Sequence, residues 1–581
     1  MAGPGRGDAS AFYNDRINAW PPSAVRVHEK NTTNRRHGNN MSCTTLLVGK
    51  DASYDGSTII ARNEDSCNGE FDPKQFVIVK PEDQPRAYKS VLSHVEIALP
   101  DDPLQYSSVP NAIRKSGIWG EAGVNEANVA MSATETLTTN ERVLGADPLV
   151  EFAPAIGKPG DDDYEPEVAG GIGEEDFVTI VLPYIKTARE GVARLGALLE
   201  QYGTYEMNGV AFSDVNEIWW LETVGGHHWI ARRVPDDCYV TMPNQLGIDE
   251  FDLDDAFGEQ RDYMCSADLE EFIERNHLSL AVEGASPFSP RDAFGSHSDS
   301  DHVYNTPRAW YMQRYFNPLD EVWDGPDADH KPDADDIPWC RQPDRKITME
   351  DVKYILSSHY QETPYDPYGT RGDEASRTRF RPIGINRTNH LAAMQIRPYR
   401  PQVNRAVQWI AYGSNPFNAM VPFFPNVDDT PAYLRDTTAR VTSENFYWAN
   451  RIIGVLCDAQ HAQTMSAVEN YQLKVGGLGH AMLRAADEQV NRLGGDAVLG
   501  AAAREQDYDD EFVEDELVED VQPMEPDEII AAVRNPEVRG ILATANEDLA
   551  RQLKRETEKL LDTALYMSSL AMKNHFAMSD N

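Results

Sequence analysis

The sequence predicts an α+β fold in which short strands fill the first half of the chain and helices dominate the C-terminal part. The strand signal is clearest at residues 44–48 and 58–61, two β-branched and apolar runs on either side of the turn-rich segment 51–56. These runs predict a β-hairpin with Cys43 at its first residue. Further strands are expected at 75–80, 127–133, 217–223 and 229–234.

Apolar residues spaced three and four apart predict helices, most of them near the C-terminus. The helical segments are expected at 177–201, 267–277, 447–469, 478–493 and 536–572. Between the last two lies an acidic stretch, Glu505 to Glu528, whose composition is typical of a solvated loop. The chain is therefore divided into a leader (1–42), a main domain (43–500), an acidic linker (501–530) and C-terminal helices packed on the main domain (531–581).

The first 42 residues differ in composition from the rest of the chain. They are rich in Asn, Arg, Pro and Gly and show no amphipathic period, which predicts a disordered leader or propeptide. The segment lacks the apolar core of a secretory signal, so export is not expected. Met41 offers an alternative start of translation.

Charge and composition exclude several classes of partner. The 581 residues carry 95 acidic and 53 basic side chains, a net charge of −42, which repels nucleic-acid phosphate and anionic lipid. No run approaches the roughly 18 apolar residues of a membrane span. We therefore expect a soluble protein with no nucleic-acid or membrane partner.

The six cysteines contain no CxxC motif, which argues against a zinc framework and a disulfide scaffold and favours the reducing cytoplasm. Adjacent His227 and His228 are expected on opposite faces of a strand, so they should not share a ligand. We predict no metal and no cofactor. Five cysteines are expected to be small buried hydrophobes: Cys67, Cys238, Cys265, Cys340 and Cys457.

Cys43 differs from the other cysteines because it opens a strand directly after the leader and precedes Arg62 and Asp65. A thiol is mostly protonated at pH 7, and an α-amine with a pKa near 8 can accept its proton. If the Ser42–Cys43 bond is cut, one residue supplies both nucleophile and base. Arg62 would favour the thiolate, and Asp65 could hold the α-ammonium. The alternative is that Arg62 and Asp65 form an exposed ion pair at a strand end.

The segments CTTLLVGKDASYDGS (43–57) and ARNEDS (61–66) resemble the opening of the PepD-type dipeptidases of lactic acid and related bacteria. More distantly, Cys43 and the Arg-Asn-x-Asp run are similar to penicillin V acylases and bile salt hydrolases. The resemblance continues through 123–135, 219–237 and 409–425 and covers most of residues 43 to about 480. It does not extend to the leader or the acidic stretch.

The resemblance implies a four-layer αββα sandwich of the N-terminal-nucleophile hydrolases, with a helical C-terminal portion. It also implies hydrolysis of dipeptides with a free N-terminus, through a thioester on Cys43 and without a metal. We expect autoprocessing before Cys43, cytoplasmic location and a homo-oligomer. The rivals are a linear-amide acylase, which needs an apolar acyl pocket, and a non-catalytic member of the same fold.

Further site residues follow from the resemblance. Asn244 is implied as the oxyanion-hole side chain, with an Asx turn as its alternative. Glu135 lies where the related acylases supply a main-chain N–H to the oxyanion, with an exposed strand-end glutamate as its alternative. Arg308 is either a further active-site arginine or a residue of a helix surface.

Overall fold

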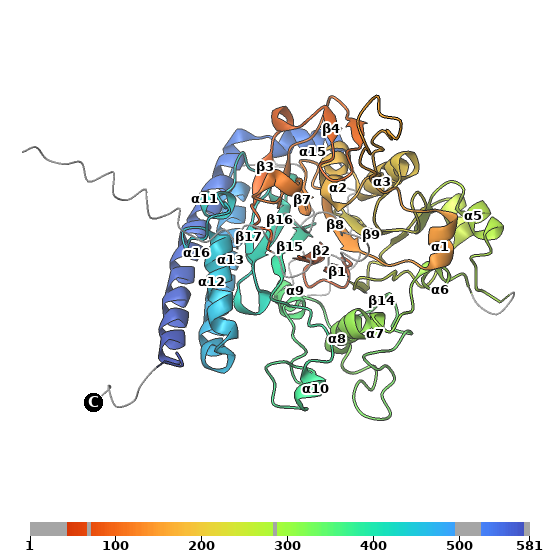
Figure 1. Ribbon diagram of the computed structural model, residues 1–581. Coiled ribbons are helices and arrows are strands. Elements are labelled where there is room, and N and C mark those ends of the chain that lie inside the picture. Colours follow the sequence, from red (N-terminus) through yellow and green to blue (C-terminus); the bar gives the residue numbers. More distant parts are fainter. Residues whose placement is uncertain (1–42, 67–70, 283–286, 494–523, 575–581) are drawn as a thin grey trace, which may run out of the picture. The chain divides into compact units, whose positions relative to one another are not determined.

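The computed structural model describes residues 43–66, 71–282, 287–493 and 524–574 (Figure 1). The predicted leader, Cys67 and most of the acidic linker lie outside these residues. Helix α15 (Pro526–Val533) begins inside the range predicted as linker, 501–530, so the C-terminal helices resume earlier than expected. This helix begins with a proline in its first turn, and its N-terminus is capped by the Glu528 carboxylate, which accepts a hydrogen bond from the Glu525 N–H.

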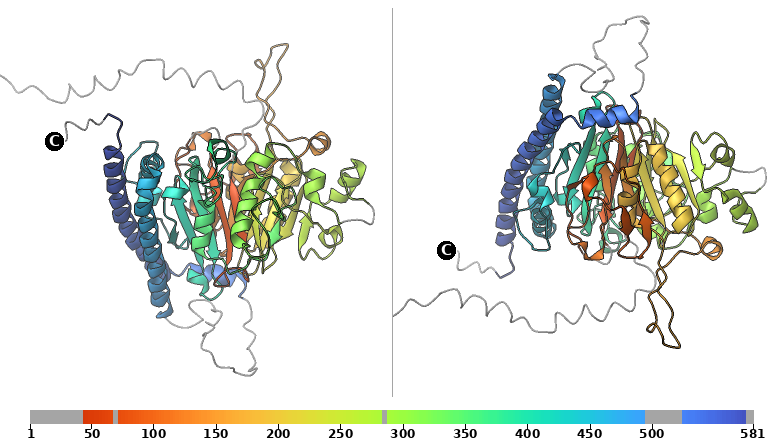
Figure 2. Two further views of the ribbon diagram at one scale, coloured as in Figure 1. Left: turned by 90° about the horizontal axis from the view of Figure 1, so that it is seen from below. Right: turned by 90° about the horizontal axis from the view of Figure 1, so that it is seen from above.

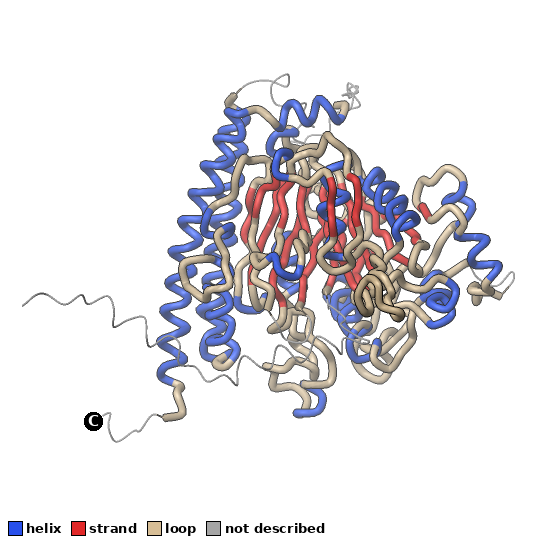
Figure 3. The backbone as a smooth tube through the Cα atoms, turned by 45° about the horizontal axis from the view of Figure 1, so that its top comes forward, coloured by secondary structure: helices blue, strands red, loops and turns tan. Residues whose placement is uncertain are grey.

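Two antiparallel sheets form the centre of the fold (Figure 3). The seven-stranded sheet has the order β14 (Cys340–Arg341), β12 (Tyr239–Met242), β1 (Thr44–Val48), β2 (Thr58–Asp65), β15 (Thr388–Ile396), β16 (Ala406–Tyr412) and β17 (Val421–Phe423). The six-stranded sheet has the order β13 (Tyr263–Cys265), β11 (Trp229–Arg233), β10 (Ile218–Thr223), β9 (Asn208–Ser213), β8 (Ala130–Thr136) and β7 (Ala122–Val124). Two small pairs join β3 (Val77–Val79) to β6 (Tyr106–Ser108) and β4 (Ala87–Lys89) to β5 (Glu96–Ala98).

The predicted hairpin at the start of the main domain is confirmed. Strand β1 has the predicted bounds, and β2 continues four residues beyond the predicted end to Asp65. The extension exists because β15 pairs with β2 along its whole length, and pairing with a long neighbour overrides the weak local propensity of polar residues. As a result, Arg62 and Asp65 lie within a central strand.

Side chains alternate between two cores along these strands, as the period of two requires. Leu47 and Ile60 face the core between the two sheets, where they meet Trp220 of β10. Leu46 and Ala61 face the opposite core, beneath helices. Because β1 and β2 are buried on both faces, the polar residues they carry are also withdrawn from water.

Helices lie outside both sheets, as Figure 2 shows. Helices α2 and α3 pack on the six-stranded sheet, whereas α9, α12 and α13 pack on the seven-stranded sheet, and α16 lies against α12 and α13. The helices are α1 (Glu141–Ala146), α2 (Glu174–Val181), α3 (Ala188–Tyr202), α4 (Leu253–Phe257), α5 (Leu269–Arg275), α6 (Pro290–Phe294), α7 (Asp301–Tyr304), α8 (Thr306–Phe316), α9 (Met349–Leu356), α10 (Glu374–Arg377), α11 (Ala432–Arg435), α12 (Phe446–Asp458), α13 (His461–Asn491), α15 and α16 (Pro536–Leu570).

Two of the predicted helical segments are each divided into two helices in the structure. The segment 177–201 is divided into α2 and α3, because Pro183 lies in a 3-10 turn between them and Thr187 caps α3. The segment 447–469 is divided between α12 and α13 at residues 459–460, where no proline or glycine marks the break. Helix α13 then runs without interruption through the segment predicted at 478–493.

The expectation for the adjacent histidines is wrong. His227 and His228 lie in the turn before β11, and both rings contact Asp147, with Nδ1–Oδ distances of 3.0 and 2.7 Å. Glycine-rich turn geometry, not strand alternation, sets their directions. Across the described residues, no cluster of three or more His, Cys, Asp or Glu side chains could hold a metal ion. None of the helices in the described ranges is both long and apolar enough to cross a bilayer.

Candidate active site

Cys43 lies immediately before β1 and is fully buried. The hairpin places Thr45 opposite Arg62, so the arginine returns to the start of β1 from the neighbouring strand. Arg62 Nη2 donates a hydrogen bond to Cys43 Sγ at 2.9 Å. The predicted pairing of this cysteine with an arginine 19 positions later is therefore present as a direct contact.

Arg62 is the centre of a buried group of charges. Its Nη1 donates to Glu121 Oε2 at 2.7 Å, and its Nη2 donates to Glu174 Oε1 at 2.5 Å. Lys74 Nζ lies 2.9 Å from Glu121 Oε1 and 3.5 Å from Glu64 Oε1. All five side chains are almost completely buried, so removing one partner would leave an uncompensated charge away from water.

Two opposing effects act on the Cys43 thiol. Burial raises its pKa well above the usual value, and the Arg62 guanidinium lowers it, while Glu174, Glu135 and Asp65 raise it further. The net direction is upward, so the thiol is neutral at pH 7. A base close to the sulfur is needed before this cysteine can act as a nucleophile.

Arg308 reaches the same residue from α8. This fully buried side chain donates from Nη1 to the Cys43 carbonyl oxygen and to Thr44 Oγ1, the latter at 2.7 Å. Burial and the nearby Arg381 lower its pKa to about 10. The helix-surface alternative for Arg308 is wrong, because its side chain points into the sheet.

Asn244 follows β12 and lies beside Arg308. Its Oδ1 accepts a hydrogen bond from Arg308 Nη2 at 2.7 Å, and its Nδ2 donates to the Thr136 carbonyl at 2.9 Å. The amide is thus held between α8 and the end of β8. Arg308 bridges it to the Cys43 backbone, because the guanidinium contacts both residues. Asn244 is therefore linked to Cys43 through Arg308, and its role in the oxyanion hole stays a prediction.

Glu135 and Asp65 occupy different sides of this site. Glu135 is completely buried and its Oε2 accepts from Thr45 Oγ1 at 2.8 Å, so the exposed alternative is wrong. Within the described residues, the Asp65 carboxylate accepts hydrogen bonds from Arg381 and from Thr388 Oγ1. The exposed ion-pair alternative is also wrong, because Arg62 and Asp65 are buried and bind different partners.

Four members of the site were not predicted: Lys74, Glu121, Glu174 and Arg381. The sequence carried one usable signal, three consecutive acids, Glu174 to Asp176, at the start of an otherwise apolar helix. Acids at a helix N-terminus are normally explained by the helix dipole, which hides such a signal. The other three are single charged residues in loops or at strand ends.

Glu135 supplies a pH-dependent test of this geometry. Burial raises its pKa from 4.5 to about 8, so the folded state holds a proton that the unfolded state releases above pH 4.5. Stability should therefore fall as pH rises from 4.5 to 8 and level off above 8. Glu135→Gln should remove this fall, on the order of a few kcal/mol, and leave stability at pH 4 nearly unchanged.

The measurement is urea unfolding of both proteins at pH 4.5, 6.5 and 8.5. Thr45→Val, which removes the hydroxyl donor and keeps the carboxyl, serves as the matched control and should retain the pH-dependent fall. Parallel pH profiles for the unaltered protein and Glu135→Gln would contradict a buried, protonated Glu135.

Comparison with known proteins identifies the class to which this fold and site belong. The model of peptidase family C69 matches residues 42–474, a range that starts one residue before Cys43 and includes every site residue described above. The match is to enzymes that hydrolyse peptide bonds. The chain belongs to peptidase family C69.

Individual relatives agree with this assignment. The chain is 73% identical over 540 residues to the "Dipeptidase" of Bifidobacterium longum (strain NCC 2705), covering 93% of this chain and 100% of the relative. It is 51% identical over 540 residues to the "Probable dipeptidase A" of Streptococcus pyogenes serotype M3, with the same coverage. It is 44% identical over 456 residues to the "Dipeptidase A" of Lactobacillus helveticus, covering 78% of this chain and 90% of the relative.

Proposed function

We propose that this chain is a metal-independent cysteine dipeptidase that hydrolyses dipeptides with a free N-terminus. The observation that carries the proposal is the 2.9 Å contact between Cys43 Sγ and Arg62 in a member of peptidase family C69. The names of the relatives from Bifidobacterium, Streptococcus and Lactobacillus support dipeptides as the substrate class.

In this proposal, cleavage of the Ser42–Cys43 bond activates the enzyme. The amide nitrogen of Cys43 is not basic, whereas the α-amine that cleavage releases has a pKa near 8 and lies on the same residue as the thiol. The amine takes the thiol proton, which offsets the effect of burial on the pKa of Cys43. Arg62 stabilises the resulting thiolate.

The thiolate then attacks the carbonyl carbon of the dipeptide, and the α-ammonium of Cys43 donates its proton to the leaving amine. The first amino acid remains as a thioester, which water hydrolyses with the α-amine as base. Asn244 Nδ2 and a main-chain N–H at the end of β8 stabilise the oxyanion. Asp65, which accepts from Arg381 and Thr388, orients the α-ammonium.

The charges around Cys43 support recognition of a free substrate N-terminus. Glu135 acts electrostatically on the thiol, and a substrate ammonium that displaces the proton of this buried carboxyl would pair with the resulting carboxylate. The buried guanidinium groups of Arg308 and Arg381 act electrostatically on Glu135 and suit the substrate carboxylate. The two stacked sheets with helices on their outer faces fit the αββα arrangement proposed with this mechanism.

The test compares alanyl-alanine with N-acetyl-alanyl-alanine. A site that pairs with the substrate ammonium should hydrolyse the free dipeptide roughly 10³-fold faster or more, since the acetyl group removes the cation with which Glu135 would pair. A metal chelator should leave both rates unchanged. Equal rates for the two substrates would contradict the proposal and favour the linear-amide acylase.

A further inference from the structure

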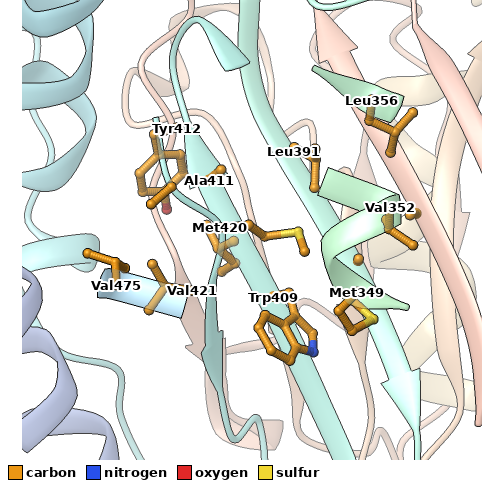
Figure 4. Close-up of a cluster of buried hydrophobic side chains, with 14 of the residues drawn as sticks. Met349, Val352, Leu356, Leu391, Trp409, Ala411, Tyr412, Met420, Val421 and Val475 are labelled. Carbon is orange, nitrogen blue, oxygen red and sulfur yellow. The ribbon is translucent and has the colours of Figure 1, made fainter. Parts of the chain in front are cut away.

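A cavity of about 910 Å³ lies on the outer face of the seven-stranded sheet, between α9, α13, β16 and the loop that leads into β17. Met349, Trp409 and Met420 form its apolar floor, and Figure 4 shows these three side chains gathered beside α9 and β16. None of the residues that line it belongs to the Cys43 site. The cavity has the size and apolar lining of a small-molecule site.

One cationic side chain, Lys353 of α9, enters this cavity without an acidic partner among the described residues. Its Nζ donates to Ser357 Oγ and to the Asn415 carbonyl, both at 2.5 Å and both neutral acceptors. Burial alone lowers its pKa to about 7. An incoming anion can pair with this buried amine without displacing a protein carboxylate, so little free energy is spent on breaking an existing ion pair.

Three of the acids that line the cavity already contact basic side chains. Glu350 lies 2.6 Å from His480, Asp351 lies 2.7 Å from Arg345, and Asp366 lies 2.7 Å from His359. A fourth acid, Glu469, is exposed at the rim. Lys353 is therefore the side chain with which the charged group of an anionic ligand would pair.

Two glycines in the middle of α13 keep one wall of the cavity open. Gly476 and Gly477 both line it, and a Cβ at either position would meet no heavy atom within 4 Å. Glycine weakens a helix interior, and here no close contact requires it. At Gly479, in contrast, a Cβ would approach Pro422 Cδ to 2.6 Å, so packing accounts for that glycine.

From these observations we propose that the cavity binds a small apolar molecule that carries one carboxylate. The carboxylate pairs with Lys353, and the apolar body covers Met349, Trp409 and Met420 beside the glycine wall. This inference stands independently of the proposed dipeptidase activity, because it uses a different part of the fold and none of the residues around Cys43.

The first test is isothermal titration calorimetry of the full chain with octanoate and with octanol, its uncharged counterpart. Octanoate should bind the unaltered protein, and Lys353→Met, which removes the amine and keeps an unbranched side chain one atom shorter, should weaken octanoate by about tenfold or more. Octanol should bind both proteins with equal affinity. Absence of octanoate binding, or equal octanoate affinity in both proteins, would overturn the proposal.

Proton uptake distinguishes direct pairing from a structural role of Lys353. At pH 8 the amine is mostly neutral, and a bound carboxylate raises its pKa, so octanoate binding should take up a proton. Titrations in buffers of different ionisation enthalpy measure this number. Uptake should be absent in Lys353→Met, and binding without uptake in the unaltered protein would contradict the pairing.

A second pair of variants locates the ligand without altering any charge. Gly477→Leu should fill the open wall and weaken both octanoate and octanol by about tenfold or more. Gly540→Leu places the same side chain at another open helical glycine, in α16 and outside the cavity, and should leave binding unchanged. Octanoate affinity unaltered by Gly477→Leu would place the ligand elsewhere and refute the site.

Discussion

Replacing Cys43 with alanine is expected to slow dipeptide hydrolysis by roughly 10⁴-fold or more, because it removes the nucleophile and leaves Arg62 facing an empty position. The fold should survive, since the change removes one sulfur atom from a buried position. Steady-state rates with a free dipeptide, together with circular dichroism, measure the two effects separately.

Cys457→Ala is the matched control for this variant. Cys457 is also completely buried, but it lies in α12 within the apolar core and has no charged partner in the part of the chain that the structure describes. Its removal should leave the rate unchanged. If Cys43→Ala kept a rate within tenfold of the unaltered protein, Cys43 would not be the nucleophile.

Cys43→Ala also tests the cleavage before residue 43. Intact-mass measurement of the purified, active protein should give a chain that begins at Cys43. If the thiol is required for cleavage, Cys43→Ala should retain the segment that precedes residue 43. A fully active protein in which Ser42 is still attached would refute the proposed mechanism, because the α-amine would then be an amide.

Arg62→Met is expected to lower the free energy of unfolding by about 3 to 5 kcal/mol and to abolish hydrolysis. Methionine fills a similar volume, but Glu121 and Glu174 lose their shared cation in a fully buried site. Burial and Glu121 already raise the pKa of Glu174, so protonation of this carboxyl would offset part of the loss at low pH. Urea unfolding at pH 5 and pH 8 measures both effects.

Arg275→Ala provides the comparison on the surface. Arg275 pairs with Glu271 one turn away on α5, and both side chains are exposed, so its removal should cost about 0 to 1 kcal/mol. A loss of less than about 1 kcal/mol in Arg62→Met would show that the buried charges do not depend on this arginine.

The parts of the site that lie close in sequence could be predicted. β-Branched runs around a turn define the β1–β2 hairpin, and an antiparallel hairpin places Arg62 near its first strand whatever the rest of the fold does. Asn244, Glu135 and Arg308 come from three separate elements. Only their resemblance to known hydrolases indicated a common site, because no local pattern reports contacts between distant segments.

The buried acids were missed for a different reason. A glutamate in a sequence is normally read as a surface residue, since charged side chains are rarely buried without a partner. Glu121 and Glu174 are buried because Arg62 and Lys74 arrive from β2 and from the loop before β3. Burial of each glutamate depends on its cationic partner, and that partner is far away in the sequence.

Strand β1 pairs with a strand on both sides: Thr45 lies opposite Met242 of β12 and opposite Arg62 of β2. Chain ends usually fray, but a new end created at Cys43 would be only one residue from a strand held by two neighbours. The new α-amine would therefore already be held beside the sulfur, and little conformational entropy would be lost in positioning it. The proposed cleavage would turn a continuous chain into a catalytic terminus without requiring the sheet to move.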